Sequence, residues 1–229
     1  SMGTKNVVDL CKAAGIPRIV YVSTISVYDW DSMSSEAYEG SPLLLDTAYA
    51  NSKFQGECFV RDSGLDWRIA RLGTVYGTGD RANFWKLALA LKYRRFILPG
   101  RGMARKSVIP VTVAGELVTR LATKKDISHR LMNLALPEAP SLKEIVDAFC
   151  DTCGFQRPIS FPVWLLRVSA LGGDFAEKFI GRSPLTSEML KKLTQNTAVS
   201  TQRMKQSLGP IEYSSFAENL AQSAAYYQG

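Results

Sequence analysis

The sequence predicts an α/β protein built on a parallel sheet, and three observations support this. Helical spacing of apolar residues over 3–14 is followed by a β-branched apolar run, Ile19–Val22, and the same order returns with a helix over 46–62 and a strand over Trp67–Leu72. Alternating helices and strands are typical of sheets with helices on both faces. At 229 residues and 46% hydrophobic content, the chain is long enough for one such domain with a small appendage, and a disordered or fibrous protein is excluded.

The first helix and strand are defined by local signals. Gly15 and Pro17 end the helix, and the strand that follows contains consecutive β-branched residues. Ser23 and Thr24 then fall at the carboxyl end of that strand. Ligands of open α/β sheets bind at this end, so two hydroxyls here are candidates for a site.

The second helix and strand repeat the pattern. Asp46 or Thr47 can cap a helix that runs to about Asp62 and is closed by Gly64. The strand Trp67–Leu72 follows, and three glycines make the next segment a tight loop.

The rest of the chain becomes increasingly helical. We expect a helix over 82–93, a basic loop over 94–106, a strand over 107–113 and a helix over 113–123. Ser141 and Glu144 have the spacing of a capping box and open a mainly helical region. We therefore expect two parts, an α/β part over 3–140 and a mainly helical part over 141–229.

The charge and cysteine content narrow the classes of partner and compartment. Lys and Arg number 28 against 21 Asp and Glu, giving a net charge of +7 that favours anionic partners. We interpret the basic loop first as a solvated surface, second as a contact for an anionic substrate, and only third as a nucleic-acid surface. Four cysteines are too few for a disulfide scaffold, which favours a reducing cytosol, and no apolar run is long enough to span a membrane.

The single histidine and one pair of cysteines are the residues that bear on metal or redox chemistry. His129 is the single histidine, so a metal site with two imidazoles is excluded. Cys150 and Cys153 have CxxC spacing, but no second pair accompanies them, and a helix that packs two small thiols is the favoured interpretation. No metal site is predicted.

Tyr49 and Lys53 carry the chemistry that the sequence suggests. Four residues apart on a helix, their side chains lie on one face, one turn apart. An ammonium beside a phenol stabilises the phenolate and lowers the tyrosine pKa, which makes Tyr49 a usable acid or base. Thr24, at the strand end, can share a substrate oxygen with Tyr49. The spacing alone occurs by chance in many helices.

Three longer motifs, in order, strengthen this interpretation. They are residues 3–28, with the strand that ends in Ser-Thr; residues 48–53, Ala-Tyr-Ala-Asn-Ser-Lys, with Glu57; and residues 71–80, Arg-Leu-Gly-Thr-Val-Tyr-Gly-Thr-Gly-Asp. Together they resemble the extended short-chain dehydrogenase/reductase superfamily, whose fold is a Rossmann-like parallel sheet with a small, mainly helical substrate domain. The C-terminal segments 161–166, 184–188, 199–209 and 215–218 look like its 3β-hydroxysteroid and sterol dehydrogenase branch more than its UDP-galactose epimerase branch.

The resemblance implies a role for each site residue. Tyr49 is the catalytic acid/base, Lys53 positions the nicotinamide ribose, and Thr24 is the catalytic hydroxyl, with Ser23 as the fallback. The further residues implied to contact NAD or NADP are Ser23, Leu72, Gly73 and Thr74, and those implied to contact substrate are Ser26, Val75, Tyr76, Arg105 and Lys106. The resemblance also implies a homodimer through the helices 3–14 and 46–62, with the small residues Ala13, Ala50 and Ser52 allowing close approach.

One part of the family pattern is not found. Members begin with a strand, a Gly-rich turn and a helix that bind the cofactor pyrophosphate. Here the one G-x-G-x-x-A string, Gly77–Ala82, follows the second strand, and we interpret it as a substrate-side loop. We therefore expect this chain alone to bind NAD(P) weakly or not at all, and to show no dehydrogenase activity.

Three functions remain open at this point. The first is an NAD(P)-dependent oxidoreductase acting on a secondary alcohol or ketone, in the cytoplasm. The second is a nucleotide-sugar epimerase or dehydratase that uses the same residues. The third is a non-catalytic remnant that serves as a binding or sensing module.

Overall fold

The structure, a computed structural model, describes residues 2–170, 186–209 and 213–229. The chain forms two compact units, each assembled from three segments. Unit 1 comprises Ser1–Val75, Ser107–Ala139 and Ala198–Tyr213, and unit 2 comprises Tyr76–Lys106, Pro140–Thr197 and Ser214–Gly229. The chain passes between the units after Val75, Lys106, Ala139, Thr197 and Tyr213. The division into the parts 3–140 and 141–229 stays a prediction.

Unit 1 is built on a parallel sheet, as predicted. Its strands are β1 (Arg18–Thr24), β2 (Asp66–Leu72) and β6 (Leu131–Leu134), in the order β1-β2-β6. Thr24 lies opposite Leu72, and Leu72 lies opposite Leu134, so the three strands end level with one another. Parallel pairing places their carboxyl ends at one edge, where the candidate site lies.

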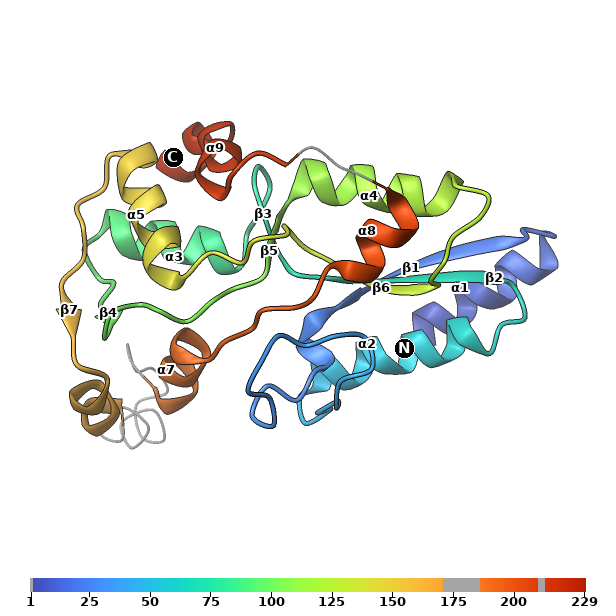
Figure 1. Ribbon diagram of the computed structural model, residues 1–229, viewed down its shortest axis with the longest axis horizontal. Helices are drawn as coiled ribbons and strands as arrows, with labels where there is room; N and C mark the ends of the chain where they lie inside the picture. The colour runs from blue at the N-terminus through green and yellow to red at the C-terminus, as the bar shows by residue number, and fades with distance from the viewer. Residues whose placement is uncertain (1, 171–185, 210–212) are drawn as a thin grey trace. The chain divides into compact units, whose positions relative to one another are not determined.

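Helices cover both faces of this sheet (Figure 1). The helices α1 (Met2–Ala13) and α2 (Ala48–Arg61) lie on one face, and α4 (Val111–Thr123) and α8 (Gln202–Leu208) lie on the other. Val8 of α1 and Val60 of α2 are buried against Ile19 and Ile69 of the sheet. Leu117 of α4 lies in the core on the opposite face. This two-sided packing is the α/β architecture that the sequence predicts.

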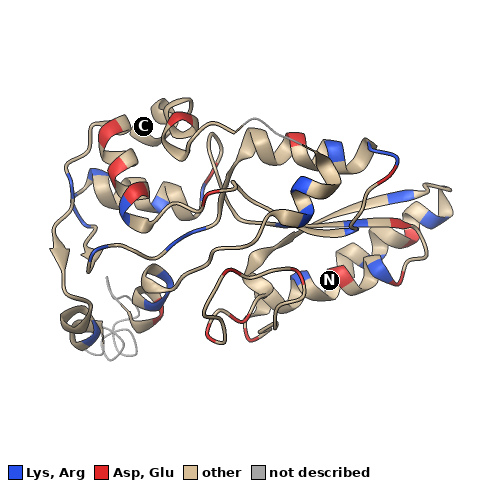
Figure 2. Cartoon of the chain, viewed as in Figure 1, with Lys and Arg blue, Asp and Glu red and all other residues tan. Residues whose placement is uncertain are grey.

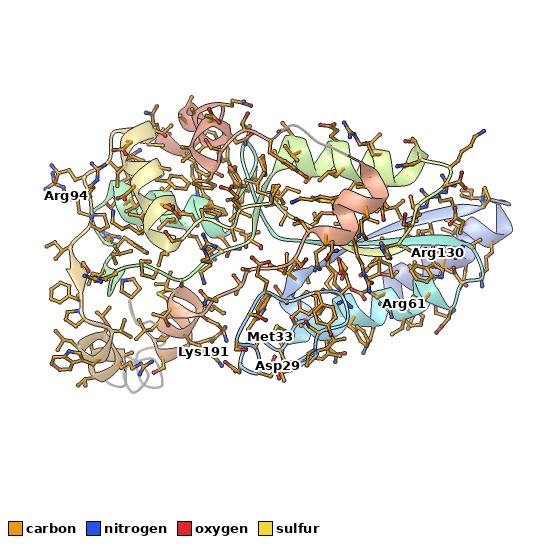
Figure 3. The ribbon with its side chains drawn as sticks, viewed as in Figure 1. Asp29, Met33, Arg61, Arg94, Arg130 and Lys191 are labelled. Carbon is orange, nitrogen blue, oxygen red and sulfur yellow. The ribbon has the colours of Figure 1, made fainter. Side chains whose placement is uncertain are left out.

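Trp67, the second residue of β2, contacts two arginines through its ring. The guanidinium of Arg61 lies 6.0 Å from the Trp67 ring centroid, and that of Arg130 lies 5.6 Å from it. Both arginines are labelled in Figure 3. These cation–π contacts join the end of α2 to the segment before β6.

A small second sheet follows the β2 strand. It pairs β3 (Thr74–Tyr76) with β5 (Val108–Pro110), so part of the segment expected to be only a loop is a strand. The strand expected over 107–113 ends at Pro110, which has φ −61° and ψ 143° and is the N-cap of α4. Proline lacks an amide hydrogen and fits the start of a helix, which explains the earlier end of the strand.

Unit 2 is mainly helical and has an aromatic core. Its described helices include α3 (Asn83–Lys92), α5 (Leu142–Cys153), α7 (Ser187–Thr194), α9 (Phe216–Ala221) and α10 (Ala224–Gln228), and residues 163–170 are also helical. Phe84, Phe149 and Phe216 lie within 6.4 Å of one another by ring centroid. The strands β4 (Leu98–Pro99) and β7 (Ser160–Phe161) pair in parallel beside these helices.

The start of α5 confirms the predicted capping box. The Ser141 hydroxyl accepts from the Glu144 amide, and the Glu144 carboxylate accepts from the Ser141 amide at 2.7 Å. Cys150 and Cys153 are buried in the same helix as free thiols. Burial raises the pKa of both thiols, which makes them inert core residues.

None of the helices in the ranges that the structure describes is long and apolar enough to cross a bilayer. Within those same ranges, His, Cys, Asp and Glu side chains form no group of three or more that could bind a metal ion.

Candidate functional site

Helix α2 carries the tyrosine and lysine pair. Thr47 caps the helix, because its hydroxyl accepts from the Ala50 amide at 3.1 Å, and the helix ends at Arg61. Tyr49 and Lys53 lie one turn apart in the first half of the helix. The Tyr49 side chain is 56% exposed, so its phenol is accessible to small molecules.

The ammonium of Lys53 is held against the first strand. Its Nζ donates to the carbonyl oxygen of Val22 at 3.1 Å and lies 5.6 Å from the Tyr21 ring centroid. Gly56, one turn further along α2, permits this close packing, since a Cβ there would lie 2.2 Å from the Tyr21 hydroxyl oxygen. Helix α2 therefore packs closely against Tyr21 and Val22 of β1.

The two hydroxyls at the end of β1 have different surroundings. Thr24 is the N-cap of η1 (Ile25–Val27), where its Oγ1 accepts from the Ser26 amide and donates to Ser26 Oγ, both at 3.1 Å. Ser23 donates to Oε1 of Glu57 at 2.6 Å. Thr24 therefore caps η1, whereas Ser23 binds the buried carboxylate of Glu57 on α2.

A buried ion pair lies beneath this edge of the sheet. Arg71 donates from Nε and Nη2 to the two carboxylate oxygens of Glu57, at 2.8 Å each. Arg61 adds a third contact to Glu57, from Nη2 to Oε2 at 3.0 Å. Burial disfavours the charged form of Arg71, but its bonds to Glu57 leave the arginine pKa above its ordinary value. The pair fastens α2 to β2 close to the strand ends.

The polar contacts continue across the sheet to β6. The Arg71 guanidinium lies 5.0 Å from the Tyr28 ring centroid, and the Tyr28 hydroxyl donates to Asn133 Oδ1 at 2.7 Å. The Asn133 amide in turn donates to Glu39 at 2.8 Å. The sequence pattern placed Glu57 in a motif but identified neither its partner Arg71 nor the buried Asn133. An arginine within an apolar strand is the signal that was available, because a buried guanidinium needs a counter-charge.

The turn after β2 is closely packed against neighbouring backbone. The Gly73 amide donates to the Leu134 carbonyl at 2.9 Å, and the Thr74 amide donates to the Ser107 carbonyl at 2.8 Å. A Cβ on Gly73 would lie 2.8 Å from the Ser107 carbonyl oxygen, so glycine is required here by the approach of the backbone. The predicted cofactor contacts of Leu72, Gly73 and Thr74 stay predictions.

The residues predicted to contact substrate are distributed over both units. Ser26 lies beside Thr24 in unit 1, and Val75 packs partly buried against the core on the α4 face of the sheet. Tyr76 is buried in unit 2, where its ring lies 4.8 Å from that of Phe216. Burial raises the pKa of the Tyr76 phenol.

The basic pair Arg105 and Lys106 belongs to unit 2. Lys106 Nζ donates to the carbonyl oxygens of Lys192 at 2.7 Å and Gln195 at 2.5 Å, and so closes the C-terminal end of α7. Burial lowers the pKa of its amine to about 8. Arg105 is exposed, and its backbone amide donates to Asn196 Oδ1 at 2.8 Å. Their predicted role in binding substrate stays a prediction.

Backbone amides in and just after the G-x-G-x-x-A string already donate hydrogen bonds to side chains of the protein. The Gly77 amide donates to the Tyr227 hydroxyl at 2.8 Å. The Asp80 carboxylate accepts from three amides at the start of α3, those of Ala82, Phe84 and Trp85, at 2.7 to 3.1 Å. An internal carboxylate thus occupies the position that a phosphate takes at a helix N-terminus. This string is not a pyrophosphate site.

Comparison with known proteins identifies sequence relatives. Residues 1–89 match a family described as NAD(P)H-binding. The chain is 29% identical to a dTDP-D-glucose 4,6-dehydratase of Mus musculus, over 66% of this chain and 45% of that protein. It is 25% identical to 3beta-hydroxysteroid-dehydrogenase/decarboxylase isoform 1 of Arabidopsis thaliana, over 90% of this chain and 52% of that protein. The chain thus spans about half the length of these relatives.

Solved structures share the fold. The Bordetella bronchiseptica enzyme WbmH, in complex with NAD+, aligns with a TM-score of 0.73 at 19% identity, over 99% of this chain and 67% of its own. UDP-N-acetylglucosamine 4-epimerase from Bacillus cereus aligns with the same TM-score and identity, over 99% of this chain and 71% of its own. The sequence relatives confirm the resemblance that the three motifs predicted, and these structures confirm the fold class.

Proposed function

We propose that this chain, which resembles the extended short-chain dehydrogenases/reductases and whose residues 1–89 match an NAD(P)H-binding family, supplies the catalytic side of an NAD(P)-dependent oxidoreductase. Its substrate would be a secondary alcohol or the corresponding ketone, in a fairly apolar molecule. One observation carries the proposal: Lys53, on the same helix as the exposed Tyr49, is bound to the Val22 carbonyl of β1, the strand that ends in Thr24.

Each side chain then has a defined task. Tyr49 takes the proton of the alcohol oxygen, or returns one to the carbonyl oxygen in the reverse direction. Thr24 provides a second hydrogen bond to that oxygen. Both hydroxyls already donate a hydrogen bond, Ser23 to the Glu57 carboxylate at 2.6 Å and Thr24 to the neutral Ser26 hydroxyl at 3.1 Å. Thr24 is favoured for this task because a bond to a neutral partner is weaker than one to a carboxylate and is exchanged more readily for a substrate oxygen.

The donors of Lys53 fit the ribose end of a nicotinamide cofactor. An ammonium has three hydrogens, and the bond to the Val22 carbonyl uses one of them. The other hydrogens suit ribose hydroxyls. When bound, NAD or NADP would supply the hydride acceptor or donor.

A nucleotide-sugar epimerase or dehydratase is the second candidate. The relative named dTDP-D-glucose 4,6-dehydratase favours it, as do structures named as complexes with UDP-sugars and NAD. The same Thr24, Tyr49 and Lys53 would act on the sugar. A thermal-shift comparison separates the two, because sugar nucleotides would stabilise an epimerase or dehydratase, whereas sterol or other apolar ketones would stabilise the proposed dehydrogenase.

The decisive variant is Tyr49→Phe, assayed in the longest natural protein that contains this sequence. Turnover should fall by about 10² to 10⁴ fold, the range for loss of a general acid/base. Tyr38→Phe is the matched control, since Tyr38 is also 56% exposed in unit 1, and it should leave turnover unchanged. Equal turnover in both variants would reject the assignment of Tyr49 and favour the non-catalytic alternative.

A homodimer through α1 and α2 is part of the proposal. The two helices pack against each other, and α1 exposes Val7 and Leu10 to the surroundings. Ala50 is fully buried within the unit, so it does not lie on the outer surface where close approach was expected. Sedimentation should give a dimer that Leu10→Asp dissociates, and a 25.3 kDa species alone at micromolar concentration would contradict it.

A further inference from the structure

Two segments of unit 2 that are sixty residues apart pair through the strands β4 and β7. In the β4–β7 pair, the Leu98 amide donates to the Ile159 carbonyl at 3.0 Å, and the Gly100 amide donates to the Phe161 carbonyl at 2.7 Å. The basic segment around β4 is therefore next to the apolar segment around β7. We call this surface the Trp164 face; it comprises Arg94, Arg95, Ile97, Arg101, Met103, Ile159, Phe161, Trp164, Leu165 and Val168.

The apolar half of the Trp164 face is exposed. Residues 163–170 are helical, and this helix buries Leu166 and Ala170 together with Leu190 of α7. Trp164 and Val168, which share another side of the helix, are 67% and 63% exposed, and Ile159 is 71% exposed. A solvated helix places polar residues opposite its buried side. The helix 163–170 instead has apolar residues on its buried side and also on the opposite, exposed side.

The other half of the Trp164 face is basic. Residues 81–106 contain eight Lys or Arg and no Asp or Glu, and three of the eight, Arg94, Arg95 and Arg101, belong to the face. Unit 2 carries 15 basic and 8 acidic residues and unit 1 carries 13 of each, so the net charge of +7 arises from unit 2 (Figure 2). Within the described part of the chain, Arg94, Arg95 and Arg101 form no salt bridge. Figure 3 shows Arg94 pointing outward from its segment.

We propose that the Trp164 face binds the surface of an anionic lipid bilayer. Ile, Leu and Val side chains enter the boundary between headgroups and acyl chains, a tryptophan lies at headgroup depth, and arginines pair with lipid phosphates. The two paired segments carry exposed aliphatic residues together with exposed arginines, and this combination fits the partner in both hydrophobicity and charge. The protein would lie on the membrane and not span it.

Other occupants match the Trp164 face less well. Single-stranded nucleic acid is bound by aromatic stacking platforms in a basic groove, and most of the apolar residues here are aliphatic and do not stack on bases. A second copy placed symmetrically on the same face would bring two surfaces of the same net positive charge together, and like charges repel. An anionic bilayer avoids both problems.

The test measures binding of this chain to vesicles of phosphatidylcholine alone and to vesicles with about one third phosphatidylglycerol. We expect flotation with the anionic vesicles only, and release at about 1 M salt, where charges are screened beyond about 3 Å. The variant R94Q/R95Q should bind about 30-fold more weakly, taking about 1 kcal/mol per arginine at an anionic surface. The matched control K12Q/K205Q removes two exposed charges of unit 1 and should bind like the unchanged protein.

A second measurement reports on the apolar half of the face. Trp164 is the most exposed of the four tryptophans, so brominated lipid should quench fluorescence in the unchanged protein and much less in Trp164→Phe, which still binds. The proposal is overturned if anionic vesicles are not bound at low salt or if R94Q/R95Q binds as well as K12Q/K205Q. It is overturned equally if bound protein shows no quenching, or if oligonucleotides bind and vesicles do not.

Discussion

Arg71 and Glu57 form a two-pronged ion pair, Nε to Oε1 and Nη2 to Oε2, with both distances 2.8 Å and both side chains buried. The pair joins β2 to the helix that carries Tyr49 and Lys53. Ser23, at the end of β1, donates to the same carboxylate. The two strands and the helix are therefore fixed relative to one another at the edge of the sheet where the candidate site lies.

Removing one partner of this pair should be strongly destabilising. Arg71→Met leaves a buried carboxylate, which costs about 3–5 kcal/mol of unfolding free energy, and the remaining contact of Glu57 with Arg61 favours the lower end. The double variant Arg71→Met/Glu57→Leu should recover part of the loss, because no unpaired charge remains. Urea denaturation measures both.

The control for this experiment is an exposed pair. Lys5 contacts Asp9 at 2.8 Å, and both side chains are more than half exposed. Lys5→Met should change the midpoint little, since exposed pairs contribute little. If Arg71→Met and Lys5→Met shift the midpoint equally, the buried pair does not have the role described.

Gly56→Ala should destabilise the protein although it adds a good helix former. The new methyl group would lie 2.2 Å from the Tyr21 hydroxyl oxygen and 2.5 Å from Cζ, so the ring or the helix must move, at a cost of about 1–3 kcal/mol. Gly115→Ala in α4 is the matched control, because no atom lies within 4 Å of its Cβ position, and it should stabilise by about 0.5–1 kcal/mol. Thermal unfolding should give shifts of opposite sign, and two upward shifts would refute the packing argument.

Local signals predicted the elements that depend on neighbouring residues. Thr47 and the Ser141–Glu144 box appear in the structure as the caps that their spacing indicates. The strand Leu131–Leu134 was missed, because four residues with a central asparagine do not form a recognisable strand pattern. Asn133 is buried there since Tyr28 and Glu39, about one hundred residues earlier, satisfy its hydrogen bonds. Such partners are determined by tertiary structure.

The residues of the candidate site also fall into two groups, those predicted from local spacing and those whose contacts depend on tertiary structure. The positions of Tyr49 and Lys53 on one helix face followed from their spacing, and the structure adds the Val22 carbonyl that binds Lys53. Lys106 was grouped with Arg105 as a contact for anions, because a lysine in a basic loop has no visible partner in the sequence. Its acceptors are main-chain carbonyls at the end of α7, some ninety residues later.

Lys106 should make stability depend on pH above neutrality. Its pKa is about 8 in the folded chain because of burial, and 10.5 is its ordinary value. Between these values the unfolded chain binds more protons, so unfolding free energy should rise with pH across the window. Lys106→Met lacks this titration and should show a flatter profile, whereas Lys86→Met, at an exposed position on α3, should follow the unchanged protein. Denaturation at several pH values measures the difference, and identical profiles for all three proteins would contradict the assignment.

The last prediction concerns cofactor affinity of the 229-residue chain. Dinucleotide pyrophosphates are bound by free amides of a glycine turn at a helix N-terminus. In the string that comes nearest to this pattern, the Gly77 amide is bonded to Tyr227 and the first amides of α3 to Asp80. Lys53 and Thr24 can contact only the nicotinamide end, so most of the binding energy of the cofactor is not provided. Calorimetry should therefore give no micromolar affinity for NAD or NADP with this chain, and dehydrogenase activity should be undetectable. A micromolar dissociation constant would mean that other residues bind the pyrophosphate and would overturn this argument.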